Sequence, residues 1–198
     1  MLGGAFNPPH IGHLVLAHEA AFQLDLERVI LVPTGEAPHK RIEPEPGPAV
    51  RLEMARRAAA GDELLEVSDL EIREDGPSYT FRTLERLSEQ RPGDRIFFLM
   101  GADVASQLES WKRPERVLEL ASLGIAGRPG TTLDEAEAAL ERLGAPERAE
   151  TIRMPEIAIS STRIRRRVAQ RRPVRYLVPD PVIELIESAG LYREAVRA

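Results

Sequence analysis

Short apolar and β-branched runs alternate along the chain with longer stretches in which apolar residues recur every three or four positions. The apolar runs have the length of buried strands and cover residues 28–33, 64–72, 95–101, 123–127 and 152–160. The amphipathic stretches have the length of helices and cover residues 11–24, 48–60, 78–90, 114–121, 132–143, 161–170 and 180–189. This alternation predicts an α/β fold, a Rossmann-like doubly wound parallel sheet with helices on both faces.

The length of the chain limits how this fold is organised. A chain of 198 residues has the size of one domain, and we expect a single domain over residues 1–198 with a small helical C-terminal part at about 161–198. Parallel sheets of this kind bind ligands beyond the carboxyl ends of their strands. Residues that directly follow a predicted strand are therefore the first candidates for a functional site.

Composition narrows the class of protein. The chain has no cysteine, which excludes disulfides and thiolate sites, and no apolar run approaches the ~18 residues of a membrane span. No basic region followed by an apolar core marks a secretion signal, so we expect a cytoplasmic protein without a membrane partner. The net charge of −5 argues against nucleic acid as a partner.

Basic residues are unevenly distributed. The chain has 25 arginines and two lysines, and eight arginines against one acid, Glu156, fall between residues 151 and 175. A solvated arginine face and an RNA-binding patch both account for this segment. We favour the solvated face, because no aromatic side chains are interleaved with the arginines and the whole chain is acidic.

The first thirteen residues contain the segment GGAFNPPHIGH, which cannot continue a strand. Glycines allow a ligand to approach the backbone, and prolines suit a loop or a first helical turn. His10 and His13 then lie three residues apart at the start of a predicted helix, so both imidazoles share one face beside free backbone N–H groups. This arrangement favours a phosphate site. The alternative is a pair of histidines that only cap a surface helix.

A third histidine in the same helix is interpreted differently. His18 lies on the apolar stripe formed by Ile11, Val15 and Phe22, so we expect its side chain to be packed against the core rather than to take part in catalysis.

Motifs along nearly the whole chain resemble a known family. GGAFNPPHIGH and ISSTRIR resemble the signatures of the H-x-G-H nucleotidyltransferases, which share a fold with class I aminoacyl-tRNA synthetases. APHK, GPSYTFRTL, FFLMGAD, SWK, GRPG and YLVPDPVIELIESAGLY follow in the order and spacing of bacterial nicotinate-nucleotide adenylyltransferases. The resemblance implies the nucleotidyltransferase type of Rossmann-like fold and a transfer of the adenylyl group of ATP to nicotinate mononucleotide. The products are deamido-NAD and pyrophosphate.

The resemblance also implies roles for individual residues. The catalytic residues would be His10, His13 and Arg165. ATP would contact Gly3, Gly4, Ala5, Phe6, His10, His13, Gly101, Asp103, Arg128, Ser160, Ser161 and Arg165. The nicotinate mononucleotide would contact Asn7, Lys40, Ser78, Tyr79, Thr80, Trp111 and Lys112. We expect no metal ligand from the protein, with Mg²⁺ carried on the ATP phosphates, and we note a homo-oligomer as a possible assembly.

Three positions depart from the family pattern. The family often has TFDP where this chain has AFNP, so Asn7 replaces a charged residue. Relatives carry Asn or Gln after the second strand, where this chain has Thr34 and Gly35. Only Met1 and Leu2 precede the glycines, so we expect either that the first strand is nearly absent or that the true start codon lies upstream.

Other functions remain open from the sequence. A related adenylyl- or cytidylyltransferase would act on nicotinamide mononucleotide or on phosphopantetheine, and a non-catalytic nucleotide-binding module would bind ATP without releasing pyrophosphate. A fragment of a tRNA synthetase is disfavoured, because no anticodon-binding domain follows the HIGH segment.

Overall fold

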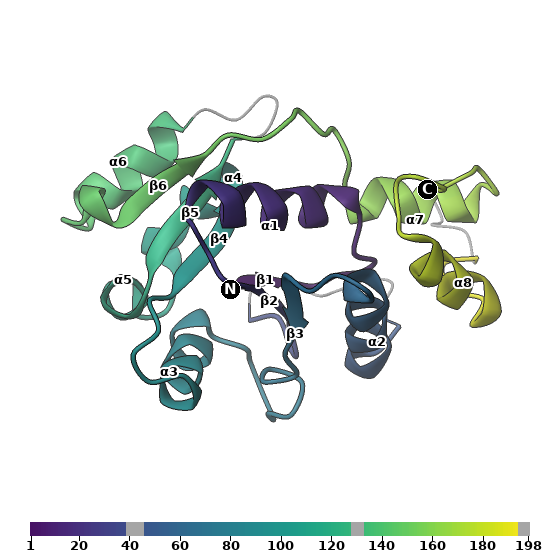
Figure 1. Cartoon of the computed structure of the whole chain (residues 1–198), viewed down its shortest axis with the longest axis horizontal. Helices are drawn as coiled ribbons and strands as arrows, with labels where there is room; N and C mark the ends of the chain where they lie inside the picture. The colour runs from purple at the N-terminus through teal and green to yellow at the C-terminus, as the bar shows by residue number, and fades with distance from the viewer. Residues whose placement is uncertain (39–45, 128–132, 194–198) are drawn as a thin grey trace.

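The computed structural model describes residues 1–38, 46–127 and 133–193 of the chain. Within them, six strands form one sheet: β1 (Leu2–Gly4), β2 (Val29–Pro33), β3 (Leu65–Val67), β4 (Phe97–Gly101), β5 (Ser122–Ala126) and β6 (Ala149–Ile152). All neighbouring strands are parallel, in the order β3-β2-β1-β4-β5-β6 (Figure 1). The strand order reverses between β1 and β4, which is where ligands bind in open parallel sheets. The predicted Rossmann-like fold is confirmed.

Helices cover both faces of this sheet. In the described residues they are α1 (Ile11–Gln23), α2 (Pro48–Ala59), α3 (Thr80–Gln90), α4 (Ala102–Ala105), α5 (Pro114–Leu120), α6 (Asp134–Arg142), α7 (Ser161–Ala169) and α8 (Asp180–Ser188). Alternate residues of β2 face opposite ways: Ile30 and Val32 pack with α3 and α5, whereas Val29 and Leu31 pack with α1. Figure 1 shows α1 on one side of the sheet and α3 and α5 on the other.

The first strand is short, as expected, but it is fully integrated. Leu2 is paired with Leu31 of β2 on one side and with Leu99 of β4 on the other. The pairing extends to Met1, whose amine donates to the Phe97 carbonyl at 2.7 Å and whose carbonyl accepts from the Leu99 amide at 2.9 Å. A three-residue strand therefore holds the centre of the sheet with its ladder groups paired.

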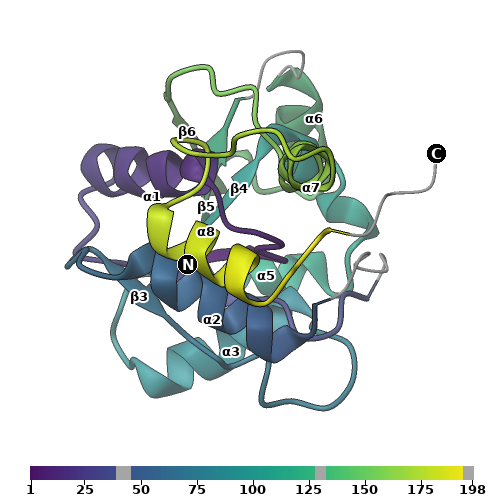
Figure 2. The same cartoon turned by 90° about the vertical axis from the view of Figure 1, so that its right-hand side faces the viewer.

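The last two helices form a separate cluster beside the sheet. Ile164 of α7 and Val182 and Ile186 of α8 pack with Met54 and Ala58 of α2. Figure 2 shows α8 running next to α2, and Figure 1 shows both α7 and α8 at the end of the molecule where β1 leads into α1. The helical C-terminal part thus lies against the carboxyl side of the sheet.

Two predicted strands end elsewhere than expected. The run 64–72 is a strand only to Val67, because Ser68 and Asp69 begin a turn in which the Ile72 amide donates to the Asp69 carbonyl at 2.9 Å. The run 152–160 is a strand only at Ile152, since β6 begins earlier, at Ala149. After β6 the backbone of Arg153 pairs with the Gln23 side chain instead of a strand, at 2.6 Å and 2.9 Å.

The expected orientation of α1 is wrong. His18 is half exposed and its Nε2 lies 2.7 Å from a carboxylate oxygen of Asp62, while Phe22 is 86% exposed. The buried residues of α1 are Leu16, Ala17, Ala20 and Ala21. Small side chains allow the helix to lie close to the sheet, and the prediction missed this face because it followed the larger apolar residues.

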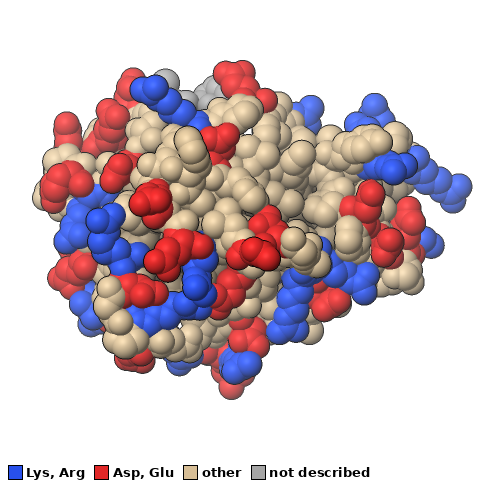
Figure 3. Space-filling model, in the orientation of Figure 1, with Lys and Arg blue, Asp and Glu red and all other residues tan. Residues whose placement is uncertain are grey.

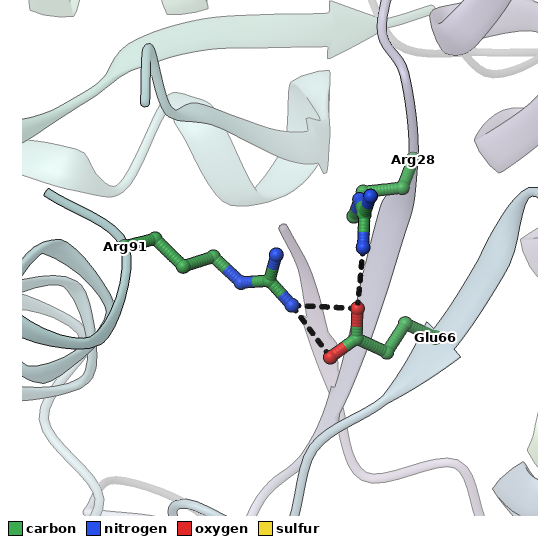
Figure 4. A network of polar contacts seen from close by, with 3 residues as sticks. All are labelled: Arg28, Glu66 and Arg91. Atoms are coloured by element: carbon green, nitrogen blue, oxygen red, sulfur yellow. Dashed lines mark hydrogen bonds and ion pairs between the residues drawn. The ribbon is translucent and has the colours of Figure 1, made fainter. Parts of the chain in front are cut away.

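A polar network connects the end of α3 to β3, the strand at one edge of the sheet. A guanidinium nitrogen of Arg91, which ends α3, donates to both carboxylate oxygens of Glu66 on β3, at 2.7 Å and 2.6 Å. Arg28, just before β2, donates to the same carboxylate at 3.4 Å (Figure 4). The network joins the end of α3 and the residue before β2 to β3.

Surface charges of both signs are interspersed on the face drawn in Figure 3. Exposed pairs such as Arg142 with Glu109, at 2.6 Å, each contribute little to stability, because water and salt screen the two charges. Over residues 1–38, 46–127 and 133–193, no helix has the length and apolar character needed to cross a bilayer.

Packing between β4 and β5 requires a glycine. A Cβ at Gly124 would lie 2.6 Å from a methyl carbon of the buried Leu99 and 3.3 Å from one of Leu24. We expect Gly124→Ala to lower the free energy of unfolding by about 1–3 kcal/mol, measured by urea denaturation. Gly127→Ala is the matched control, because a Cβ there would meet no atom of the described residues within 4 Å. Equal stability of the two variants would contradict this packing.

Candidate active site

The loop between β1 and α1 carries the two histidines of the H-x-G-H segment. His10 is the N-cap of α1, in extended conformation, and His13 lies in the first turn of the helix. The two rings stack with their centroids 3.7 Å apart and their planes 27° from parallel. The two imidazoles therefore lie together at the start of α1, as the sequence predicts.

One hydrogen bond sets the tautomer of His13. The backbone N–H of His10 donates to Nδ1 of His13 at 3.1 Å. A ring nitrogen that accepts carries no proton, so neutral His13 has its proton on Nε2. His13 therefore has an Nε2–H donor whether the ring is neutral or charged.

The residues around the histidines fix their ring positions. Phe6 has a left-handed φ of 47°, is 1% exposed, and meets the His13 ring edge-on with centroids 5.1 Å apart. A Cβ at Gly12 would lie 3.2 Å from the His10 ring, so only glycine leaves that ring undisturbed. Phe6, predicted to contact ATP, thus supports His13 from within the fold.

A buried arginine connects this loop with the loop after β2. Arg51 of α2 is 0% exposed, and its guanidinium donates to the carbonyls of Ala5 at 3.1 Å, Thr34 at 2.5 Å and Gly35 at 2.9 Å. These carbonyls lie beyond the ends of two adjacent strands and have no ladder partner there. Arg51 therefore satisfies partly buried backbone acceptors of both loops at once.

A cavity of about 360 Å³ opens next to this pair of loops. It collects predicted site residues that are distant in sequence: Gly3, Gly4, Ser78, Tyr79, Thr80, Trp111 and Lys112. Gly3 and Gly4 belong to β1, the next three residues begin α3, and the last two precede α5. His10 and His13 are not among its lining residues. The cavity and the histidine pair are thus separate parts of the candidate site. β1 connects them, because Gly3 and Gly4 line the cavity and the loop that follows β1 carries the histidines.

Aromatic and basic side chains form one wall of this cavity. The Trp111 ring packs at 5.9 Å from Phe98 of β4, with the planes tilted by 56°. The Lys112 ammonium lies 4.5 Å above the Tyr79 ring, a cation–π contact. A flat apolar surface and a cation at the start of α3 suit a planar ring that bears a negative group.

The floor of the cavity contains a buried carboxyl group. Glu71 is 9% exposed, and its Oε1 accepts from the Thr83 hydroxyl at 2.7 Å. Burial raises the pKa of Glu71. Hydrogen bonds from Thr83, Ser78 and the Gly35 amide, together with the charge of Arg51, act in the opposite direction and lower this pKa, but burial is the largest effect.

The departure from the family at Gly35 has a steric cause in this chain. A Cβ at Gly35 would lie 2.1 Å from the Glu71 carbonyl oxygen, so this backbone approach requires glycine. The Gly35 amide donates to the Ser78 hydroxyl at 3.1 Å, which joins the loop after β2 to the start of α3.

The start of α7 lies against the histidine loop. Ser160 caps the helix, its hydroxyl accepting from the Arg163 amide at 3.3 Å. The Ser161 hydroxyl donates to the Pro8 carbonyl at 2.8 Å. Arg165 donates to the Asn7 carbonyl at 2.8 Å, and burial lowers the pKa of its guanidinium.

The other predicted contacts divide into three groups. Gly101 ends β4 and Asp103 follows it in α4, at the carboxyl edge of the sheet. Asn7 is 2% exposed and its side-chain oxygen accepts from the Tyr192 hydroxyl, so its predicted contact with substrate stays a prediction. Lys40 and Arg128 lie outside the described residues.

Sequence reasoning missed three residues of this site: Arg51, Glu71 and Tyr192. Arg51 lies in an arginine-rich helix, and nothing in the pattern marks it as the buried one. Glu71 was placed in a strand that ends earlier. Among the described residues, no group of three His, Asp or Glu side chains is arranged to hold a metal ion.

A larger cavity of about 880 Å³ lies between α7 and α8, away from these residues. Its wall includes Arg171, Arg172, Arg175 and the acidic Asp180 and Glu184. None of the predicted site residues lines it, so we place the functional site at the smaller cavity.

Comparison with known proteins agrees with this geometry. The model of the cytidylyltransferase-like family matches residues 1–167. A Roseiflexus sp. (strain RS-1) protein named "probable nicotinate-nucleotide adenylyltransferase" is 43% identical over 193 residues, covering 98% of this chain and 96% of that protein. A Rubrobacter xylanophilus protein of the same name is 40% identical over 198 residues, covering 100% and 92%.

A solved structure supports the fold independently. The nicotinic acid mononucleotide adenylyltransferase of Plasmodium falciparum complexed with NaAD superimposes with a TM-score of 0.78, covering 99% of this chain and 97% of that one. The sequences are 18% identical, so the comparison bears on the fold.

Removal of the buried guanidinium tests its role in the two loops. Arg51→Met leaves three partly buried carbonyls without this donor, so we expect the free energy of unfolding to fall by about 3 kcal/mol. Arg56→Met on the same helix is the control, because Arg56 is exposed and its guanidinium lies 3.8 Å from the Asp69 carboxylate. Urea denaturation of both variants measures the difference. A loss no greater than that of the control would contradict the assignment.

Proposed function

The chain belongs to the family of bacterial nicotinate-nucleotide adenylyltransferases, and we propose that it transfers the adenylyl group of ATP to nicotinate mononucleotide, giving deamido-NAD and pyrophosphate in NAD biosynthesis. The observation that carries this proposal is the placement of a stacked histidine pair beside a cavity with an aromatic, basic wall. The histidine pair suits the phosphates, and the cavity suits the pyridine ring with its carboxylate.

The reaction needs no covalent enzyme intermediate. A phosphate oxygen of nicotinate mononucleotide attacks the α-phosphorus of ATP, the bond to the β-phosphate breaks, and pyrophosphate leaves with the electron pair. Catalysis consists of positioning the two nucleotides and stabilising charge that moves onto phosphate oxygens. His13 donates from Nε2–H to these oxygens, and His10 binds beside it.

The start of α7 holds the leaving end of ATP. Arg165 lies at the histidine loop and binds the β- and γ-phosphates, since a guanidinium matches two phosphate oxygens at once. Ser160 and Ser161 bring the N-terminus of this nine-residue helix to the same place, where free amides and the helix dipole favour negative charge. Asp103, which follows β4, accepts from a ribose hydroxyl, and Gly101, the last residue of β4, contacts ATP beside it.

The smaller cavity accepts the pyridine ring. Trp111 stacks on the ring, while the backbone amides at Tyr79 and Thr80 and the Lys112 ammonium face its carboxylate. A carboxylate gains from the N-terminus of α3 and from the cation, whereas a neutral amide does not. The proposal therefore favours nicotinate mononucleotide over nicotinamide mononucleotide.

A divalent cation fits this site on the substrate rather than on the protein. Mg²⁺ prefers phosphate and water oxygens and would neutralise part of the triphosphate charge. The donors that the described residues offer around the histidines are imidazoles, hydroxyls, amides and a guanidinium, which suit the phosphate oxygens themselves. We propose action in the cytoplasm, on small-molecule substrates, with no nucleic acid partner.

Pyrophosphate release with alternative acceptors tests the proposed function. With ATP and Mg²⁺, we expect turnover with nicotinate mononucleotide, and kcat/KM at least about tenfold lower with nicotinamide mononucleotide, because its amide lacks the charge that α3 and Lys112 bind. Phosphopantetheine is the acceptor control. A preference for nicotinamide mononucleotide or phosphopantetheine, or ATP binding without pyrophosphate release, would refute the proposal.

Substitution of one histidine tests the catalytic assignment. His13→Ala removes the Nε2–H donor, and we expect kcat to fall by about 10²–10³-fold while the unfolding midpoint stays close to that of the unsubstituted chain. His18→Ala, on the same helix, is the control, because His18 is half exposed and paired with Asp62. The assignment fails if the two variants turn over at similar rates.

A further inference from the structure

Residues of the C-terminal part hold the histidine loop by hydrogen bonds. The Ile11 amide, at the start of α1, donates to the Leu177 carbonyl at 3.0 Å, just before α8. From α7 come the bonds already described, to the carbonyls of Pro8 and Asn7. The backbone that carries the two histidines is therefore fixed by a part of the chain more than 150 residues away in sequence.

Asn7 is the residue on which these contacts converge. Its carbonyl accepts from Arg165 at 2.8 Å, and its side-chain oxygen accepts from the hydroxyl of Tyr192. Asn7 is 2% exposed, so its side chain has no access to bulk water as a substitute partner. It lies three residues before His10, on the same short loop.

Tyr192 is placed for this contact by an unusual backbone. It follows α8, where Gly190 has a φ of 63° and the Leu191 amide donates back to the Ile186 carbonyl at 2.9 Å. Tyr192 itself has a φ of 60°, a left-handed conformation that residues with a side chain disfavour. Such conformations persist where surrounding contacts impose them, and they concentrate at functional sites.

The ring and the hydroxyl of Tyr192 contact different parts of the molecule. The side chain is 8% exposed and packs in the cluster formed by α2, α7 and α8. Its hydroxyl lies 3.8 Å from the sulfur of Met54 and bonds Asn7. The ring therefore serves the packing of the C-terminal part, while the hydroxyl reaches out of that cluster to the histidine loop.

We propose that Tyr192 is a positioning residue for the histidine pair: its hydroxyl fixes Asn7 and, through it, the orientation of His10 and His13. The inference rests on the proposed function, since those imidazoles act on the phosphates. Without the hydroxyl, the side-chain oxygen of Asn7 loses this buried hydrogen bond, and the loop shifts. A displacement of about 1 Å at reacting groups is enough for a large loss of rate.

Tyr192→Phe removes the hydroxyl and keeps the ring. We expect kcat for adenylyl transfer to fall about 10- to 100-fold, because the histidines lose their alignment. KM for nicotinate mononucleotide, and its quenching of Trp111 fluorescence, should change less than about twofold, since that cavity contacts neither residue of the bond. A purely structural role would instead lower the unfolding midpoint and leave kcat per folded molecule unchanged.

The matched control is Tyr176→Phe. Tyr176 belongs to the same C-terminal part and also has a left-handed φ, 65°, but its side chain is 79% exposed. We expect this variant to keep full kcat. Equal kcat of the two phenylalanine variants would overturn the inference while leaving the proposed function intact, because the unsubstituted chain is assayed alongside.

A second measurement does not depend on turnover. Imidazole ¹H–¹⁵N spectra report the hydrogen bond at Nδ1 of His13 and the stacking of the two rings. We expect Tyr192→Phe to shift the signals of His10 and His13 but not of His18, and Tyr176→Phe to shift none of them. Unchanged spectra in Tyr192→Phe would overturn the inference even if the unsubstituted chain proved inactive on nicotinate mononucleotide.

A double-mutant cycle tests whether the effect passes through Asn7. If the hydroxyl acts through that side chain, Asn7→Ala combined with Tyr192→Phe lowers kcat no further than Asn7→Ala alone. Independent, multiplicative losses from the two substitutions would contradict the proposed route.

Discussion

The loop between β1 and α1 has to satisfy its backbone carbonyls while it leaves two imidazoles available to a ligand. Only six residues, 5–10, connect the end of a central strand to the first turn of a helix. Their carbonyls cannot use ladder partners, and unpaired buried acceptors are costly. Arg51 takes the carbonyl of Ala5, Arg165 that of Asn7, and Ser161 that of Pro8. The rest of the site depends on this set of donors.

These donors come from both sides of the loop, and this explains the arrangement of the molecule. Arg51 reaches from α2 and also ties down the loop after β2, which borders the smaller cavity. Arg165 and Ser161 reach from α7, which brings the helical C-terminal part against the carboxyl edge of the sheet (Figure 1). The phosphate-binding side and the pyridine-binding side of the proposed site therefore share Arg51 as a common buried support.

The fold was largely predictable from the sequence because buried parallel strands and amphipathic helices leave strong periodic patterns. Exceptions have local causes. Leu16 and three alanines form the buried face of α1, instead of the stripe of larger apolar residues that the prediction followed, so His18 was misplaced. Ser68 and Asp69 end β3 early through a turn, which also hid the position of Glu71.

The candidate site was predictable only where a motif marks it. His10 and His13 stand out by spacing, and Ser78, Tyr79 and Trp111 by family resemblance. Arg51 lies in no such motif. Tyr192 ends the motif YLVPDPVIELIESAGLY, but nothing in that motif marks its hydroxyl. What distinguishes both residues is burial beside particular carbonyl or amide oxygens. That property arises from tertiary packing and is not written in local sequence.

The most direct test of the histidine pair as a phosphate site is a titration with a non-hydrolysable ATP analogue and Mg²⁺, followed by imidazole ¹⁵N NMR. Binding through Nε2–H should move the signals of His10 and His13 in a saturable way and leave His18, which is paired with Asp62, unchanged. Saturation by the analogue without any shift at His10 and His13, or with equal shifts at His18, would show that the phosphates bind elsewhere.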